Sequence, residues 1–162
     1  MNRNTPPQRS PWVAVVLLLV GALGLTAEPL SLNYDKLKSS VNTLSPADQT
    51  VVEDAVRLIK AGDYTLALSR LTALKNTHPN NSSLRILASY ALVLTGNLVG
   101  AFDEAQKAHD APDGNSYKCW FLAKIALLNG KTAACEREIQ HLKKAGDMVA
   151  ETQALEKEMH DN

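Results

Sequence analysis

Apolar residues recur every three or four positions over most of the chain after residue 45. This spacing is typical of amphipathic helices, and no stretch has the two-residue alternation of a strand. Ser45 followed by Pro46 marks a helix start, because serine caps an N-terminus and proline fits the first turn. The pattern predicts an all-α chain with helices over residues 46–61, 64–76, 82–95, 98–110, 116–129 and 132–145.

The two segments that flank these helices have a weaker helical spacing of apolar residues. Residues 147–160 place Met148, Leu155 and Met159 on one stripe and acidic side chains on the other. This pattern predicts a terminal capping helix whose outer face is wet. Residues 28–44 are apolar at intervals and are predicted to form a linker or a short amphipathic helix.

The chain also repeats itself. Gly62, Gly96 and Gly130 follow one another at intervals of 34 residues. Small residues keep the same register on both sides of each glycine, which predicts antiparallel helix pairs whose backbones approach closely. The small residues form two columns, Ala55, Ser89 and Ala123 before the glycines, and Ala67, Ala101 and Cys135 after them.

These features resemble the tetratricopeptide repeat (TPR) family, most clearly at residues 60–67 and 77–81. The resemblance covers residues 48–149 in three units, although the family's closing proline is matched only by Pro79 and its large first-helix aromatic is missing. It implies an α-solenoid of three TPR-like helix pairs with a C-terminal capping helix, together forming a domain over residues 45–160. It also implies a non-catalytic adaptor that binds a peptide or helix of a partner protein.

The N-terminus has the features of an export signal. Arg3 and Arg9 precede an apolar run of 14 residues over positions 12–25. A spanning helix needs roughly 20 such residues, so a signal peptide over residues 1–27, cleaved after Ala27, is the favoured interpretation. We therefore expect a periplasmic or extracellular protein. The alternative is a membrane-tethered assembly subunit that keeps residues 12–25 as an anchor, in which case the membrane is also a partner.

The charge balance narrows the choice of partners. The chain carries 17 basic and 17 acidic residues, so it lacks the positive field that nucleic-acid binding requires. We expect a protein or peptide partner and no nucleic acid.

The stripe on the concave side of the predicted solenoid is apolar and carries little charge. Large exposed apolar patches often mark interaction sites, so this stripe is the predicted partner site. The alternatives stay open: residues 28–44 or the terminal helix could fill the groove from within the same chain, or two copies could associate through it as a homo-oligomer. The predicted partner-binding residues are Val52, Val56, Ile86, Tyr90, Trp120, Phe121 and Lys124.

Catalytic, cofactor and metal sites are not expected. His78, His109 and His141 fall near the ends of helices, where a cation interacts favourably with the helix dipole. Neighbouring units are expected to hold them too far apart to converge on a metal, without cysteine or carboxylate partners. Acidic pairs such as Glu136 and Glu138 are expected on exposed helix faces. A small hydrolytic enzyme is the less favoured alternative.

The two cysteines lie on opposite helices of the third unit. Cys135 is displaced by about one turn from the residue opposite Cys119, so a disulfide would exceed the usual Cα separation of roughly 7 Å. Unbridged thiols are favoured, and a disulfide is the alternative.

Overall fold

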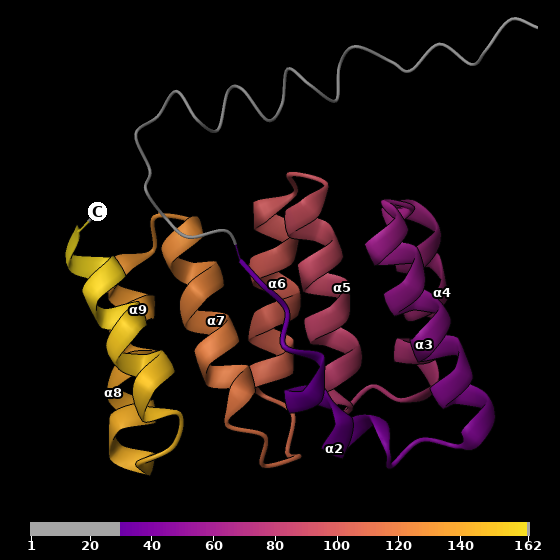
Figure 1. Ribbon diagram of the computed structural model, residues 1–162, viewed down its shortest axis with the longest axis horizontal. Coiled ribbons are helices and arrows are strands. Elements are labelled where there is room, and N and C mark those ends of the chain that lie inside the picture. Colours follow the sequence, from indigo (N-terminus) through magenta and orange to yellow (C-terminus); the bar gives the residue numbers. More distant parts are fainter. Residues whose placement is uncertain (1–29, 162) are drawn as a thin grey trace, which may run out of the picture.

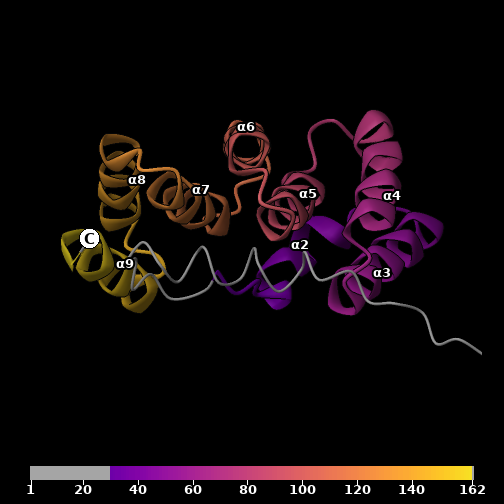
Figure 2. The same cartoon turned by 90° about the horizontal axis from the view of Figure 1, so that it is seen from above.

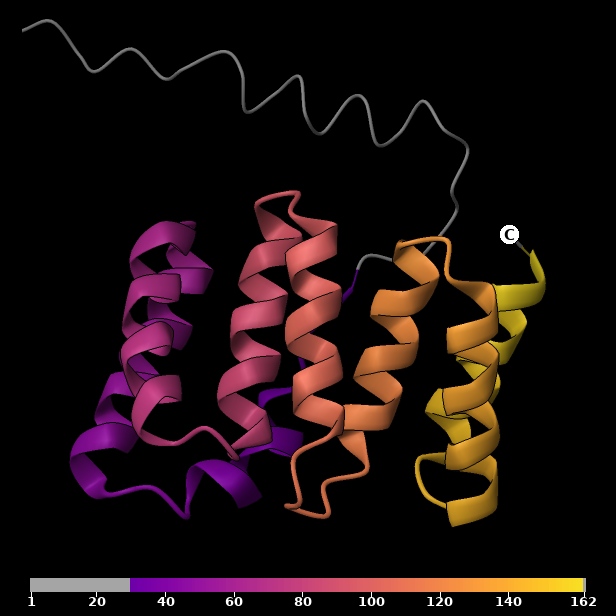
Figure 3. The ribbon, with the colours of Figure 1, turned by 180° about the vertical axis from the view of Figure 1, so that it is seen from behind.

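The computed structural model describes residues 30–161, and every regular element in this range is a helix. Helices that follow one another in sequence pack side by side, so the molecule is a row of helices (Figures 1 and 3). The predicted signal peptide lies outside the described residues. The elements are η1 (Tyr34–Leu37), a 3₁₀ helix, and the α-helices α2 (Lys38–Val41), α3 (Pro46–Ala61), α4 (Tyr64–Thr77), α5 (Ser82–Leu94), α6 (Leu98–His109), α7 (Tyr117–Leu128), α8 (Thr132–Ala145) and α9 (Val149–Asp161).

The helices predicted from apolar spacing are confirmed, with boundaries that agree within two residues. Side-chain caps explain this agreement, because they satisfy N–H groups that a helix leaves unpaired at its start. Ser45 Oγ accepts a hydrogen bond from the Asp48 amide at 3.2 Å. Asn81 Oδ1 accepts one from the Leu84 amide, also at 3.2 Å. Polar residues just before the apolar runs therefore set where α3 and α5 begin.

The glycines of the 34-residue register lie at the turns between α3 and α4, α5 and α6, and α7 and α8. Gly62 has a φ of +86° and Gly96 a φ of +80°, a left-handed conformation that L side chains disfavour. At the first turn the Asp63 amide donates to the Leu58 carbonyl at 2.9 Å, which closes the end of α3. Glycine thus permits the tight reversal that brings α4 back along α3.

The small residues of the same register are all fully buried, with no exposed surface. Ser89 Oγ donates a hydrogen bond of 2.6 Å to the Ala101 carbonyl, so a side chain of one helix reaches the backbone of the next. Such a short contact needs close helix axes, and small side chains permit them. The buried set is Ala55, Ser89 and Ala123 with Ala67, Ala101 and Cys135.

The N-terminal segment, residues 30–44, lies across one side of the row. Viewed from above, α6 lies on one side of α5 and α7, while α2 lies on the other (Figure 2). Leu37, Val41 and Leu44 are buried, and α2 packs on α5. We call the side of the row that this segment covers the concave face.

The C-terminal helix α9 covers the last helices of the row. Leu155 and Thr152 are each 2% exposed, and α9 packs on α8 and α7. An ion pair joins Lys143 of α8 to Glu156 of α9. The stripe predicted for a capping helix is therefore the side that α9 buries. Among residues 30–161, no helix combines the length and apolar character needed to cross a bilayer.

We predict that Gly62→Ala lowers the free energy of unfolding by about 1 to 2 kcal/mol, the cost of a left-handed L residue. A Cβ at this position would meet no atom within 4 Å, so the cost arises from the backbone alone. Gly62→Asn is the control and should cost less, because asparagine tolerates this conformation. Urea unfolding measures both variants, and equal stability of Gly62→Ala and the wild type would contradict the assignment.

Candidate functional site

The concave face, which the sequence analysis predicted to bind a partner, is occupied by the chain's own N-terminal segment. In Figures 1 and 2 this indigo segment, with α2, lies on the side of the row formed by α5 and α7. Leu37 has no exposed surface and belongs to the main apolar core. Leu32 and Tyr34 are partly buried against the same core. The alternative in which residues 28–44 fill the groove is thus observed for residues 30–44.

Polar side chains from the helices and the loops between them bind the backbone of this segment. Three of them donate hydrogen bonds to its carbonyl oxygens. Such bonds hold the segment through its backbone and do not depend on which side chains it carries. The bonds run from Ser83 Oγ to Leu37 at 3.0 Å, from Asn81 Nδ2 to Ser40 at 2.8 Å and from Asn115 Nδ2 to Lys36 at 3.1 Å.

Tyr117 of α7 binds the start of the segment. Its hydroxyl accepts a hydrogen bond of 3.1 Å from the Asn33 amide, and its ring stacks on Trp120 with 5.3 Å between centroids. Tyr117 is 3% exposed, and burial raises the pKa of its phenol to about 12. The hydroxyl therefore stays neutral over the physiological pH range.

Asp113 fixes the segment from the loop between α6 and α7. One carboxylate oxygen accepts hydrogen bonds from Ser40 Oγ at 2.9 Å and from the Ser82 amide at 3.1 Å. Lys118 lies 3.2 Å from the other oxygen. Burial alone would raise the pKa of Asp113, but the hydrogen bonds from Ser82, Ser40 and Lys118 outweigh it and lower that pKa.

Four of the predicted partner-binding residues are inaccessible in this conformation. Val52, Ile86 and Phe121 have no exposed surface, and Lys124 is 7% exposed. Lys124 forms an ion pair with Glu158 of α9, so its charge is balanced by a carboxylate of the same chain. Lys124 is therefore not available to a partner in this conformation, because the terminal helix supplies the carboxylate that it contacts.

Part of the concave face stays open beside the N-terminal segment. Val56, Tyr90 and Trp120 are each partly exposed. Val56 and Tyr90 line a pocket of about 260 Å³ with Tyr64 of α4 and Tyr34 of the segment. Burial, followed by the neighbouring Tyr64, raises the pKa of Tyr90. The pocket combines apolar walls with hydroxyl groups, and Lys60 is the charged residue in its lining.

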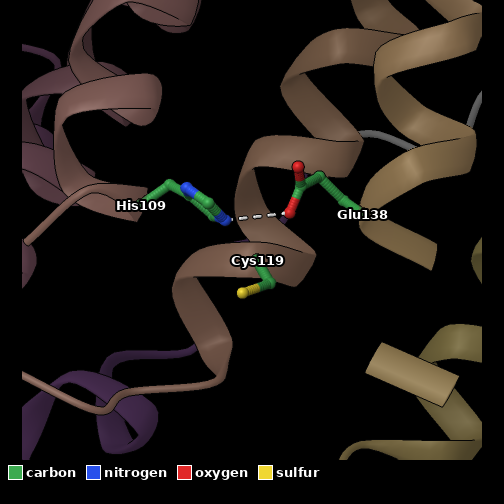
Figure 4. A group of neighbouring side chains, drawn as sticks. All are labelled: His109, Cys119 and Glu138. Carbon is green, nitrogen blue, oxygen red and sulfur yellow. Dashed lines mark ion pairs between the residues drawn. The ribbon is translucent and has the colours of Figure 1, made fainter. Parts of the chain in front are cut away.

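A second cluster lies where α6, α7 and α8 meet, and it corrects the sequence analysis (Figure 4). His109 Nε2 lies 3.1 Å from Glu138 Oε2, and His141 Nδ1 lies 3.4 Å from the same oxygen. Cys119 Sγ belongs to the same group. The prediction that these histidines stay apart, without cysteine or carboxylate partners, is wrong, and so is the exposed face expected for Glu138, which is 3% exposed.

The prediction was wrong because it considered only the distance between helix backbones and not the length of the Glu138 side chain. Helix spacing separates the backbones of α6 and α8, but the Glu138 side chain extends from α8 to the end of α6. A sequence signal existed in Glu138 and His141, whose i, i+3 spacing places them on one helix face as metal-binding helices do.

Both cysteines are free, which confirms the favoured expectation. Cys135 is buried, and burial raises the pKa of its thiol to about 11. Burial, followed by the charge of Glu138, also raises the pKa of Cys119. Neither thiol is therefore activated in the way that a nucleophilic cysteine requires.

The chain matches no model of a known protein family, and no curated protein sequence is similar enough to it to count as a relative. The TPR resemblance thus stays a prediction, and the function has to be argued from the site itself.

We predict that Leu37→Ala lowers the free energy of unfolding by about 2 to 5 kcal/mol, because it empties a fully buried position. The segment should also loosen, so trypsin should cleave at Lys36 and Lys38 faster than in the wild type. Leu66→Ala is the matched control, since Leu66 is 48% exposed and should change stability by about 0.5 kcal/mol or less. If the two variants are equally stable, the segment does not anchor through Leu37.

We predict that Asp113 makes stability depend on acid pH. Its pKa is lower in the folded chain than the unfolded value of about 3.9, so its stabilisation is present above that pH and is lost as pH falls through the folded pKa. Asp113→Asn should therefore be less stable than the wild type at pH 7, and the difference should shrink below about pH 4. Urea unfolding across this range measures it, with Asp103→Asn on the exposed side of α6 as control. A constant difference between Asp113→Asn and the wild type would argue against the assigned role.

Proposed function

We propose that the protein is a non-catalytic adaptor that holds a peptide or helix of a partner protein at its concave face. In this proposal the row of helices is an α-solenoid of three TPR-like helix pairs, with α9 as the cap. The placement of Gly62, Gly96 and Gly130 at every second turn supports the repeat, as does the complete burial of the small-residue columns.

The observation that carries the proposal is the way the concave face holds residues 30–44. An apolar anchor, Leu37, enters the core while Ser83 donates to the Leu37 carbonyl of η1 and Asn81 donates to the Ser40 carbonyl of α2. Peptide-binding grooves work in the same manner, with pockets for side chains and polar groups for the backbone. A face that holds one segment of chain in this way is suited to hold a second.

The open pocket beside Tyr34 and Tyr90 is the proposed contact for the partner. Its volume of about 260 Å³ suits one or two apolar side chains. Tyrosine rings give wide apolar contact and keep a hydroxyl for hydrogen bonding, which is why they are frequent at binding sites. The partner segment would then lie next to residues 32–34 and would leave the deeper contacts of Leu37 intact.

The other hypotheses are less favoured than the adaptor proposal. Export through residues 1–27, the tethered alternative and self-association all stay predictions. A hydrolytic enzyme is less favoured, because the one cysteine beside a histidine and a carboxylate in the described part of the chain has a raised pKa.

Site-specific photocross-linking in the host of this protein tests the adaptor proposal. A photoreactive phenylalanine at position 90 should give a discrete adduct with another protein, whereas one at position 103, on exposed α6, should not. Adding Tyr64→Ala, which empties one wall of the pocket, should lower the adduct yield about tenfold or more. Circular dichroism checks that the variant stays folded. No adduct at position 90, or identical adducts at both positions, would contradict the proposal.

A further inference from the structure

The cluster of His109, Cys119 and Glu138 takes no part in the concave face. It joins the last residue of α6, the first turn of α7 and the middle of α8 (Figure 4). One nitrogen, one sulfur and one oxygen of these side chains all lie within 4.8 Å of one another. The proposed adaptor function gives this arrangement no role.

Glu138 is the feature that needs an explanation. Its side chain is 4% exposed, and within residues 30–161 no donor forms a hydrogen bond to its Oε2 atom. Two ring nitrogens lie within ion-pair distance of this oxygen, but neither meets it with hydrogen-bond geometry. Arg137 Nε lies 4.0 Å from the other oxygen, Oε1, on a side chain that is 65% exposed, so this cation does not contact Oε2 directly. A buried carboxylate oxygen without a hydrogen bond is costly unless a cation neutralises it.

The orientation of the His109 ring also favours a cation at this cluster. Its Nδ1 atom lies 3.2 Å from Asp110 Oδ1, so a proton on Nδ1 is directed to that carboxylate. Its other ring nitrogen, Nε2, faces Glu138 Oε2 at 3.1 Å, so a metal ion beside the two atoms could take one ligand from each. A carboxylate on the far ring nitrogen is the usual second contact of a metal-binding histidine.

The distances from Glu138 to the two histidines fit a tetrahedral ion, and Cys119 Sγ lies within 4.8 Å of the His109 and Glu138 ligand atoms. Nitrogen and oxygen ligands that are 2.0 to 2.1 Å from one Zn²⁺ lie about 3.3 Å from each other. The two nitrogen-to-Glu138 separations, 3.1 Å from His109 and 3.4 Å from His141, bracket this value. The His141 side chain is 54% exposed, and its ring would have to turn further toward His109 and Cys119 to complete the site.

We propose that His109, Cys119 and Glu138 bind one Zn²⁺ ion, with His141 as the fourth ligand. Thiolate and imidazole ligands disfavour Mg²⁺ and Ca²⁺, which take oxygen ligands. Binding forms the zinc–sulfur bond as the Cys119 thiol releases its proton to the buffer, and no electron is transferred. The ion would connect α6, α7 and α8 and stabilise the C-terminal part of the row.

Titration of the reduced, metal-free full chain with Co²⁺ tests the site. We expect one equivalent to bind with a thiolate-to-cobalt charge-transfer band, and Zn²⁺ to displace it. Cys119→Ala should abolish the band, Glu138→Gln should weaken binding about 100-fold, and His141→Ala about tenfold with the band retained. Cys135→Ala is the matched control, because alanine occupies the equivalent positions 67 and 101, and it should bind like the wild type.

Two further measurements on the wild-type chain do not depend on whether variants fold. Zn²⁺ at a hundredfold excess over its Kd should raise the thermal midpoint by about 10 °C. It should also slow the labelling of Cys119 by a thiol reagent. Absence of both effects, a band that survives in Cys119→Ala, or Cu²⁺ binding that Zn²⁺ fails to match would overturn the zinc assignment. None of these outcomes concerns the concave face, so they test the zinc site independently of the adaptor proposal.

Discussion

Close packing of consecutive helices across small residues is the constraint on which the rest of the structure depends. Ala55, Ala67, Ser89 and Ala101 have no exposed surface, and the 2.6 Å bond from Ser89 to the Ala101 carbonyl leaves no room for a longer side chain. This spacing brings the helices into a continuous row. The row in turn creates the concave face and brings the end of α6 near α8.

The row leaves an apolar face that one layer of helices does not cover. Residues 30–44 cover the centre of this face with Leu37, while Tyr117 and Asn81 satisfy the polar backbone of the covering segment. The contacts on backbone atoms tolerate other sequences, whereas the Leu37 pocket selects an apolar side chain. The part of the surface that the segment covers is core for its own chain, and the part left open beside Tyr34 and Tyr90 is the proposed site for another.

Local signals made the helices predictable, because caps such as Ser45 and turns such as Gly62 act within a few residues. The covering of the predicted stripe by residues 30–44 rests on contacts such as that of Asn33 with Tyr117, 84 residues apart, and the role of this stripe in binding a partner stays a prediction. The pairing of Lys124 with Glu158 and the approach of His109 to Glu138 depend on how long side chains cross between helices. Sequence spacing alone does not encode those distances.

Amide hydrogen exchange, resolved by mass spectrometry, tests most directly whether residues 30–44 belong to the folded core. The amides of Lys36, Asn42 and Leu44 donate within this segment, and Leu37 is fully buried. The account predicts that residues 34–44 exchange as slowly as the amides of α5. Exchange of this segment at the rate of an unstructured peptide, while α5 stays protected, would contradict it.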